Sequence, residues 1–146
     1  APGIRLLSFS LSGKAELPAI NNMRHQFTPA ATSDTKIDID KANAGNALYH
    51  NSGCGVCHGG GLNSAGSGAP DLRESLANSN YSYFKAVVVD GALLPNGMPQ
   101  FRDLEESEVL AIYEYMRQQT RAAVNDSRLM LPEYVEIKSE RGRHDY

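Results

Sequence analysis

The sequence NSGCGVCHGGG, residues 51–61, contains both cysteines of the chain, with a histidine directly after the second. Cys54, Cys57 and His58 form a Cys-x-x-Cys-His pattern, and glycines stand on both sides of it. A glycine-rich segment loses much chain entropy on folding and has few side chains to bury. We therefore expect something other than ordinary core packing to hold these three side chains in place.

Four interpretations of the two cysteines are open. A structural zinc site usually needs four Cys or His ligands, and only His50 lies near enough in sequence to add one. A thioredoxin-like pair should follow a strand in an α/β pattern, whereas this motif follows a predicted helix. A disulfide across two intervening residues closes a very small loop and stabilises little. Covalent haem attachment, for which Cys-x-x-Cys-His is the signature, explains the spacing best.

The haem interpretation gives each side chain a role. The thiols of Cys54 and Cys57 would add to the two vinyl groups of the porphyrin, and His58 would bind the iron through Nε2. Met98 is the candidate for the second axial ligand, because it lies in the non-helical sequence PNGMPQF, where a core-filling role fits poorly. His50 is the nearest rival.

Composition limits the other classes of function. The chain has 146 residues, enough for one domain with extensions. It carries 14 Lys+Arg against 17 Asp+Glu, and this mildly acidic balance argues against nucleic-acid binding. No apolar run approaches the roughly 20 residues of a membrane span. The opening APGIRLL lacks the basic start and apolar core of a signal peptide, so we expect a mature form, a subunit or a piece of a longer protein.

The hydrophobic pattern predicts an all-α domain between two mostly irregular extensions. The last helix is the clearest, because its apolar residues follow the i, i+3, i+4, i+7 spacing of one buried face: Val109, Ile112, Tyr113 and Met116. Two prolines and two glycines exclude a helix in GALLPNGMPQF, residues 91–101. The predicted helices run from Asp40 as N-cap to His50 or Asn51, over 72–77, from after Ser79 to before Gly91, and from near Asp103 onward, with a Gly/Ser-rich loop at 52–70.

Three parts of the chain are expected from composition. Residues 1–38 form an N-terminal extension or linker with a possible strand at 4–11. Residues 39–123 form the domain, and residues 124–146 form a C-terminal tail.

Three motifs in order, CGVCH, GAPDL at 68–72 and LPNGMPQF before an amphipathic helix, resemble class I c-type cytochromes over about residues 39–123. The resemblance implies an all-α fold around one covalently bound haem, with the first and last helices crossing. Gly45 would let the two backbones approach. Tyr49 beside it would meet Ile112 and Tyr115 on the last helix.

The resemblance also implies the surroundings of the haem. The carbonyl of Pro70 would accept the Nδ1–H of His58 and make its imidazole more electron-rich. The domain lacks the tryptophan that usually binds a haem propionate, and Arg102 or a tyrosine is the suggested substitute. The apolar shell is expected from Leu93, Leu94, Phe101, Val87 and Val88.

A narrower resemblance concerns RLLSFSLSGKAELP near the N-terminus. It is similar to the last propeller strand and the linker of quinohaemoprotein alcohol dehydrogenases, in which a β-propeller holding pyrroloquinoline quinone (PQQ) is joined to a C-terminal cytochrome c domain. The resemblance implies a chain without a catalytic site of its own. It would accept single electrons from a PQQ-dependent domain or subunit in the periplasm and pass them to an acceptor. A free-standing periplasmic cytochrome, a ligand-binding enzyme or sensor, and a haem-free thiol module remain open.

Overall fold

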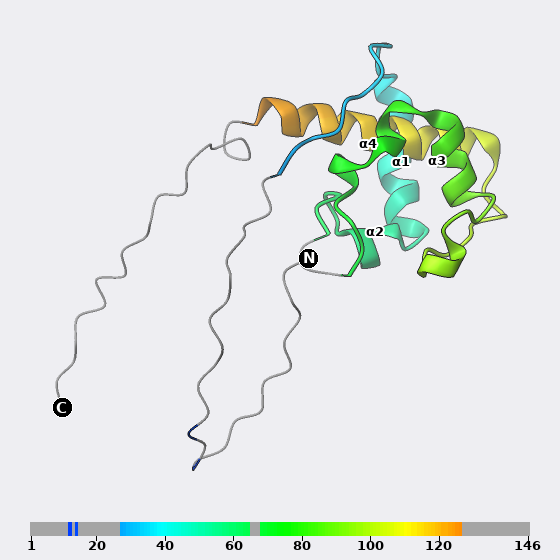
Figure 1. Cartoon of the computed structure of the whole chain (residues 1–146). Coiled ribbons are helices and arrows are strands. Elements are labelled where there is room, and N and C mark those ends of the chain that lie inside the picture. The colour runs from blue at the N-terminus through cyan, green and yellow to red at the C-terminus, as the bar shows by residue number, and fades with distance from the viewer. Residues whose placement is uncertain (1–11, 13, 15–26, 65–67, 127–146) are drawn as a thin grey trace.

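The computed structural model describes residues 12, 14, 27–64 and 68–126, which form helices and short helical turns (Figure 1). No strand occurs among these residues, and the predicted all-α fold is confirmed. The possible strand at 4–11 and most of both predicted extensions lie outside the described residues. In chain order the elements are α1 (Ile39–Asn51), α2 (Cys54–His58), η1 (Leu72–Glu74), η2 (Leu76–Ser79), α3 (Tyr81–Val88), η3 (Leu94–Asn96) and α4 (Glu106–Asn125).

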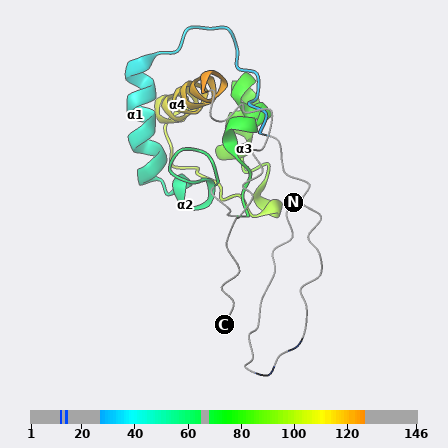
Figure 2. The ribbon, with the colours of Figure 1, turned by 90° about the vertical axis from the view of Figure 1, so that its left-hand side faces the viewer.

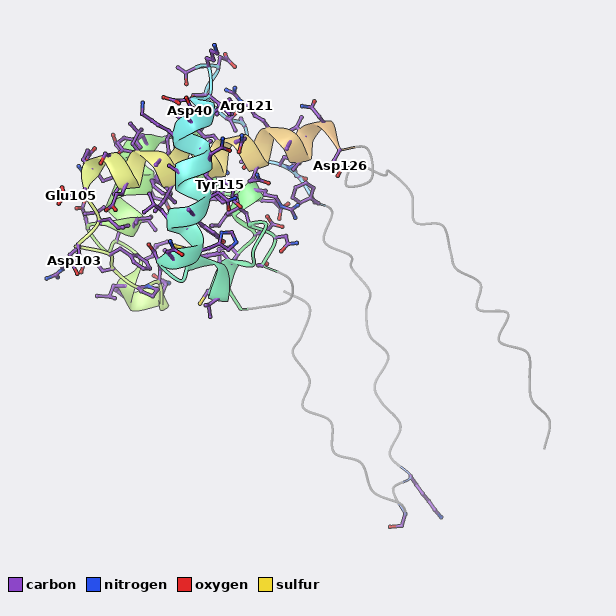
Figure 3. The ribbon with its side chains drawn as sticks, turned by 180° about the vertical axis from the view of Figure 1, so that it is seen from behind. Asp40, Asp103, Glu105, Tyr115, Arg121 and Asp126 are labelled. Atoms are coloured by element: carbon purple, nitrogen blue, oxygen red, sulfur yellow. The ribbon has the colours of Figure 1, made fainter. Side chains whose placement is uncertain are left out.

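The first and last helices cross at a glycine. Figure 3 shows α1 crossing α4, with Tyr115 of α4 near the crossing. A Cβ atom on Gly45 would lie 1.9 Å from the carbonyl oxygen of Ala111, so only glycine allows this approach of the two backbones. Beside it the rings of Tyr49 and Tyr115 meet with centroids 5.5 Å apart. The contact between α1 and α4 is therefore backbone against backbone, flanked by this pair of tilted rings.

Both long helices begin at acidic caps, although not at the predicted residues. Asp38, not Asp40, is the N-cap of α1, because its backbone is extended and its carboxylate accepts from the amide of Lys41 at 3.1 Å. Glu105, not Asp103, caps α4 in a capping box with Glu108. Near the start of each helix the sequence has two acidic residues that lie two positions apart. Only the backbone conformation decides which of the two is the N-cap.

The core lies on the predicted face of α4. Val109, Ile112, Tyr113 and Met116 are all buried, as the periodicity predicts. They pack with side chains from the other elements in one cluster, which includes Tyr49, Leu62, Ala77, Phe84 and Val88.

The short elements differ from the predictions in detail. The predicted helix over 72–77 is two 3₁₀ turns, η1 and η2. The predicted loops contain α2 and η3, one short helix each, which are too short to give a periodic pattern. The last helix runs to Asn125, two residues beyond the expected end of the domain at 123.

A buried asparagine joins the 3₁₀ turns to α4. Asn78 is fully buried, and its side-chain amide donates to the carbonyls of Leu72 and Ser75 at 2.7 and 2.9 Å. Its Oδ1 accepts from Thr120 at 2.9 Å, and its backbone carbonyl accepts from Tyr113 at 3.2 Å. Every polar group of this side chain is thus satisfied within the core.

Residues 27–38, which we call the strap, pass over α4 before entering α1 (Figure 2). Arg117 of α4 is 2% exposed and donates to the carbonyls of Ser33 and Thr35 at 3.1 and 2.6 Å. Arg121 donates to the same two carbonyls, and to the hydroxyl of Thr32 at 2.9 Å. The part of the predicted extension that the structure describes is therefore fastened to the domain. None of its described helices combines the length and apolar character that crossing a membrane requires.

Candidate haem site

A cavity of about 590 Å³ opens between α2, α3, α4 and the loop 91–101. Cys54, Cys57, His58 and Met98 all line it. Among the described residues that line it, none is Asp, Glu, Lys or Arg. The rest of the wall is mostly apolar and comes from all parts of the described domain, including Leu62, Leu72, Phe84, Val87, Val88, Ile112 and Met116.

Helix α2 sets the spacing of the Cys-x-x-Cys-His motif. It has five residues and lies between Gly53 and Gly59, which have left-handed φ values of 79° and 74°. Cys54, Cys57 and His58 stand at positions i, i+3 and i+4, which share one face of a helix. The two glycines turn the chain sharply before and after α2, so this face is directed at the cavity.

The three side chains differ in exposure. Cys54 is half-buried, and burial raises the pKa of its thiol. Cys57 is exposed, and the two thiols are not joined by a disulfide. His58 is 5% exposed and is the most buried of the three side chains. Among the residues that the structure describes, no three or more His, Cys, Asp or Glu side chains gather to hold a metal ion.

The orientation of His58 is fixed by Pro70. Nδ1 of His58 lies 3.0 Å from the carbonyl oxygen of Pro70, which is the contact that the family resemblance implies. Because a carbonyl can only accept, Nδ1 carries the proton, and in a neutral imidazole the lone pair is then on Nε2. This orientation suits binding of a metal through Nε2.

Two tyrosines hold the glycine loop after the motif. The hydroxyl of Tyr49 donates to the carbonyl of Gly59 at 2.8 Å, and the hydroxyl of Tyr115 donates to that of Gly60 at 3.2 Å. Burial raises the pKa of both phenols. Sequence reasoning assigned these tyrosines to the helix crossing and missed their second contact. The available signal was a polar tip on a buried ring, which needs a partner.

The loop that carries Met98 is built by backbone hydrogen bonds. The Met98 amide donates to the carbonyl of Leu93 at 3.2 Å, and the Phe101 amide donates to that of Val88 at 2.8 Å. Gly97, directly before Met98, has a left-handed φ of 90°. Met98 is partly buried against the core and lines the cavity, whereas its rival His50 is exposed and does not line it.

The other predicted site residues divide into two groups. Pro70, Phe101, Leu93, Val87 and Val88 line the cavity. Leu94 and Arg102 do not, and a role for these two at the haem stays a prediction. Leu94 begins η3 and is 54% exposed, because the turn directs Leu93 inward and its neighbour outward. Arg102 follows the inward-facing Phe101 and is exposed. The polar side chains that do line the cavity include Ser75, Tyr83 and Asn96, which no sequence pattern marked.

The residues present fit a haem group. Two thiols, one imidazole with a free Nε2 and one thioether form the donor set of a covalently attached haem with two axial ligands. The cavity volume is in the range of cofactor sites, and its wall is apolar. A helical fold whose first and last helices cross beside such a cavity defines a class I c-type cytochrome domain.

Comparison with known proteins agrees with this class. The family model described as "Cytochrome C oxidase, cbb3-type, subunit III" matches residues 40–116, about half of the chain, and the chain belongs to this cytochrome c family.

The relatives of known function are much longer than this chain, and the match covers only part of each. The chain is 36% identical over 126 residues to quinohemoprotein alcohol dehydrogenase ADH IIB of Pseudomonas putida, a match that covers 78% of this chain and 16% of that protein. It is 32% identical over 122 residues to lupanine 17-hydroxylase [cytochrome c] of Pseudomonas sp, covering 82% of this chain and 16% of the relative. The dehydrogenase subunit of alcohol dehydrogenase (quinone) of Acetobacter aceti is 37% identical over 113 residues, or 76% of this chain and 14% of the relative. The chain thus spans about a sixth of the length of these proteins, and the predicted resemblance to the cytochrome part of quinohaemoprotein dehydrogenases is confirmed.

Proposed function

We propose that this chain transfers single electrons through one haem c that is bound covalently by Cys54 and Cys57. His58 and Met98 are its axial ligands. One observation carries the proposal: these four side chains, which come from α2 and from the distant loop 91–101, line the same uncharged cavity.

The side chains around the cavity suit electron transfer rather than bond chemistry. Haem c, when bound, supplies an iron that changes between two oxidation states. His58 and Met98 would both hold the iron, which would leave no position for a substrate. A thioether and an apolar wall favour the ferrous state, because ferric haem carries one more positive charge. The bond from His58 to Pro70 holds the imidazole in one tautomer in both states.

The electron donor in this proposal is a PQQ-dependent dehydrogenase domain or subunit. The relatives that share 32–37% identity with the chain include quinone-dependent and quinohemoprotein alcohol dehydrogenases. The proposal places the chain in the periplasm, where a c-type haem is attached in bacteria, and assigns it an acceptor protein that takes the electrons onward. The primary substrate would be oxidised elsewhere, at the quinone.

Electrons would pass through the mouth of the cavity, which we define by the lining residues Val56, Cys57 and 96–99. Val56 is 84% exposed and Cys57 is exposed, and Leu94, which follows the lining residue Leu93, is 54% exposed. Apolar side chains on the surface at such a density favour contact with another protein. The mouth is the place where a partner would approach the haem most closely.

The test is expression of the chain in a periplasm with haem attachment machinery. We expect a red protein whose mass exceeds that of the polypeptide by one haem, and a reduced spectrum that is unchanged under carbon monoxide. Met98→Leu should abolish the methionine-ligated spectrum and open the iron to carbon monoxide. The matched control is Met116→Leu, which removes another thioether from the cavity wall with little change of volume. A colourless wild-type protein, or a spectrum that follows Met116 instead of Met98, would contradict the proposal.

A further inference from the structure

We propose that Arg73 is a positioning residue, which couples the strap to the hydrogen bond between His58 and Pro70. This inference rests on the proposed function and adds a control of reduction potential to it. Arg73 lies in η1, three residues after Pro70, and its contacts extend in both directions along the chain.

On one side, Arg73 and Glu74 receive the start of the strap. The guanidinium of Arg73 lies over the ring of Phe27, with 4.5 Å from Cζ to the ring centroid. The Ala30 amide donates to the carbonyl of Arg73 at 2.8 Å. The Thr28 amide donates to Oε1 of Glu74 at 2.6 Å. Three contacts within four strap residues thus converge on two residues of η1.

On the other side, Arg73 forms a bidentate ion pair with Asp71. Nε and Nη2 of Arg73 donate to Oδ1 and Oδ2 of Asp71 at 3.0 and 2.7 Å. Oδ1 also accepts from the backbone amide of Arg73 at 3.0 Å and caps η1. Both side chains of the pair are about 15% exposed, at 14% and 16%, so water competes with it only partly.

Asp71 in turn orients the carbonyl that holds His58. The carbonyl of Pro70 and the amide of Asp71 belong to one planar peptide unit, so the position of Asp71 sets the direction of that oxygen. The following amide, of Leu72, donates to the carbonyl of Leu62 at 2.9 Å and fixes the other end. The contacts therefore run without a break from Phe27 through Arg73, Asp71 and Pro70 to Nδ1 of His58.

The direction of the effect follows from the hydrogen bond. A short Nδ1–H···O bond makes the imidazole a better electron donor and favours ferric iron. A looser strap would free Arg73 and Asp71, lengthen this bond and favour ferrous iron. The position of the strap, which connects the haem domain to the part of the chain before it, would thereby adjust the reduction potential.

Two variants test this in the full-length haem protein. Phe27→Ala removes the ring without changing charge, and Arg73→Lys keeps the charge but loses the two-pronged geometry. For each we expect the equilibrium constant for reduction to rise about threefold, which is roughly 30 mV for a one-electron couple. The Nδ1–H proton of His58 in the ferrous protein should exchange with solvent about threefold faster, measured by NMR.

The matched control is Arg121→Lys, which loosens the strap at Thr32 and Ser33, away from η1. It should lower the thermal unfolding midpoint and leave the potential and the Nδ1–H exchange unchanged. The inference is overturned if Phe27→Ala and Arg73→Lys carry haem but keep the wild-type values, or lower the potential as simple solvent exposure would. It is also overturned if Arg121→Lys shifts the potential as much as they do. A wild-type chain that takes up no haem would instead contradict the proposed function.

Discussion

Single residues decide how closely the two long helices approach. Gly45 is the clearest case, since a Cβ there would stand 1.9 Å from a backbone oxygen that no side-chain movement can clear. In an open helix position, replacing glycine by alanine stabilises by about 0.5–1 kcal/mol. At the crossing of α1 and α4 we expect the same replacement to destabilise the fold.

Gly45→Ala should lower the free energy of unfolding by about 1–3 kcal/mol, because α1 and α4 must separate to admit the methyl group. Urea titration followed by far-ultraviolet circular dichroism measures it. Gly61→Ala is the control, since nothing lies within 4 Å of a Cβ at that position. Equal stability of the two variants would show that the crossing is looser than the structure has it.

The buried phenols of Tyr49 and Tyr115 predict a loss of stability in alkali. Burial raises the pKa of each in the folded state, so the folded protein keeps their protons longer than the unfolded chain does. Their contribution to the free energy of unfolding is complete below pH about 10, the pKa of an unfolded tyrosine. It declines as the pH rises toward the pKa in the folded state.

We expect the thermal midpoint of the wild type to fall between pH 9 and about 11, and to fall less in Tyr115→Phe. That variant loses the hydrogen bond to Gly60, about 1 kcal/mol at neutral pH, but has one fewer proton to lose. Tyr83→Phe, at an exposed tyrosine, is the control. Parallel curves for wild type and Tyr115→Phe would argue against the prediction.

At the residue scale, sequence reasoning was most reliable where chemistry restricts the choice. The spacing of Cys54, Cys57 and His58 has few uses, and the structure brings all three to one cavity with Met98. Leu94 and Arg102 do not line the cavity, because residues in a turn alternate between inward and outward without a period. No sequence pattern predicts which of the adjacent Leu93 and Leu94 faces inward.

At the scale of elements, length determined what was predictable. Helices α1, α3 and α4 have eight residues or more, enough for caps and an apolar face to be recognised. Helix α2 has five residues and is defined by the left-handed glycines around it. Its existence depends on tertiary contacts, namely the tyrosine hydroxyls that hold the carbonyls of Gly59 and Gly60.

The joint between the 3₁₀ turns and α4 gives a prediction at this scale. Asn78→Ala should lower the free energy of unfolding by about 2 kcal/mol, because it removes two hydrogen bonds to the carbonyls of Leu72 and Ser75, each of which then keeps only a backbone donor. Urea unfolding measures the change. Asn43→Ala, on the exposed side of α1, should stay within about 0.5 kcal/mol of the wild type. If Asn78→Ala lowered the free energy of unfolding no more than Asn43→Ala does, water would be replacing the side-chain amide of Asn78.

For the whole molecule, composition alone did not indicate that part of the N-terminal segment packs on the domain. Residues 1–38 look like an irregular extension, yet the strap is fastened by buried Arg117 and by Arg121. Its binding groups are mostly backbone carbonyls, such as those of Ser33 and Thr35, and every residue has one. The sequence therefore could not indicate which part of the extension packs on the domain. The polar residues Glu114, Arg117 and Thr120 on the buried side of α4 were the sign that α4 needed polar partners.

The uncharged mouth predicts how the haem protein responds to salt. Because no Asp, Glu, Lys or Arg is among the described residues that line the cavity, contacts there involve little charge, although the chain has a formal net charge of −3. The rate constant for oxidation by a small neutral or singly charged complex should change less than about twofold between 10 and 150 mM salt. Stopped-flow absorbance measures it. A rate that falls steeply with salt for one sign of complex would place the exchange at a charged face instead.

The same absence of charge affects encounters between two copies of the protein. Molecules of equal net charge repel one another at a distance, but this repulsion is weak for a charge of −3 and is screened beyond about 8 Å at physiological salt. The described residues that define the mouth carry no charge, so neither copy presents a like charge to the other through them. A reduced and an oxidised copy can therefore meet face to face, and electron self-exchange, visible as line broadening in partly oxidised samples, should be limited by orientation and not by electrostatic work.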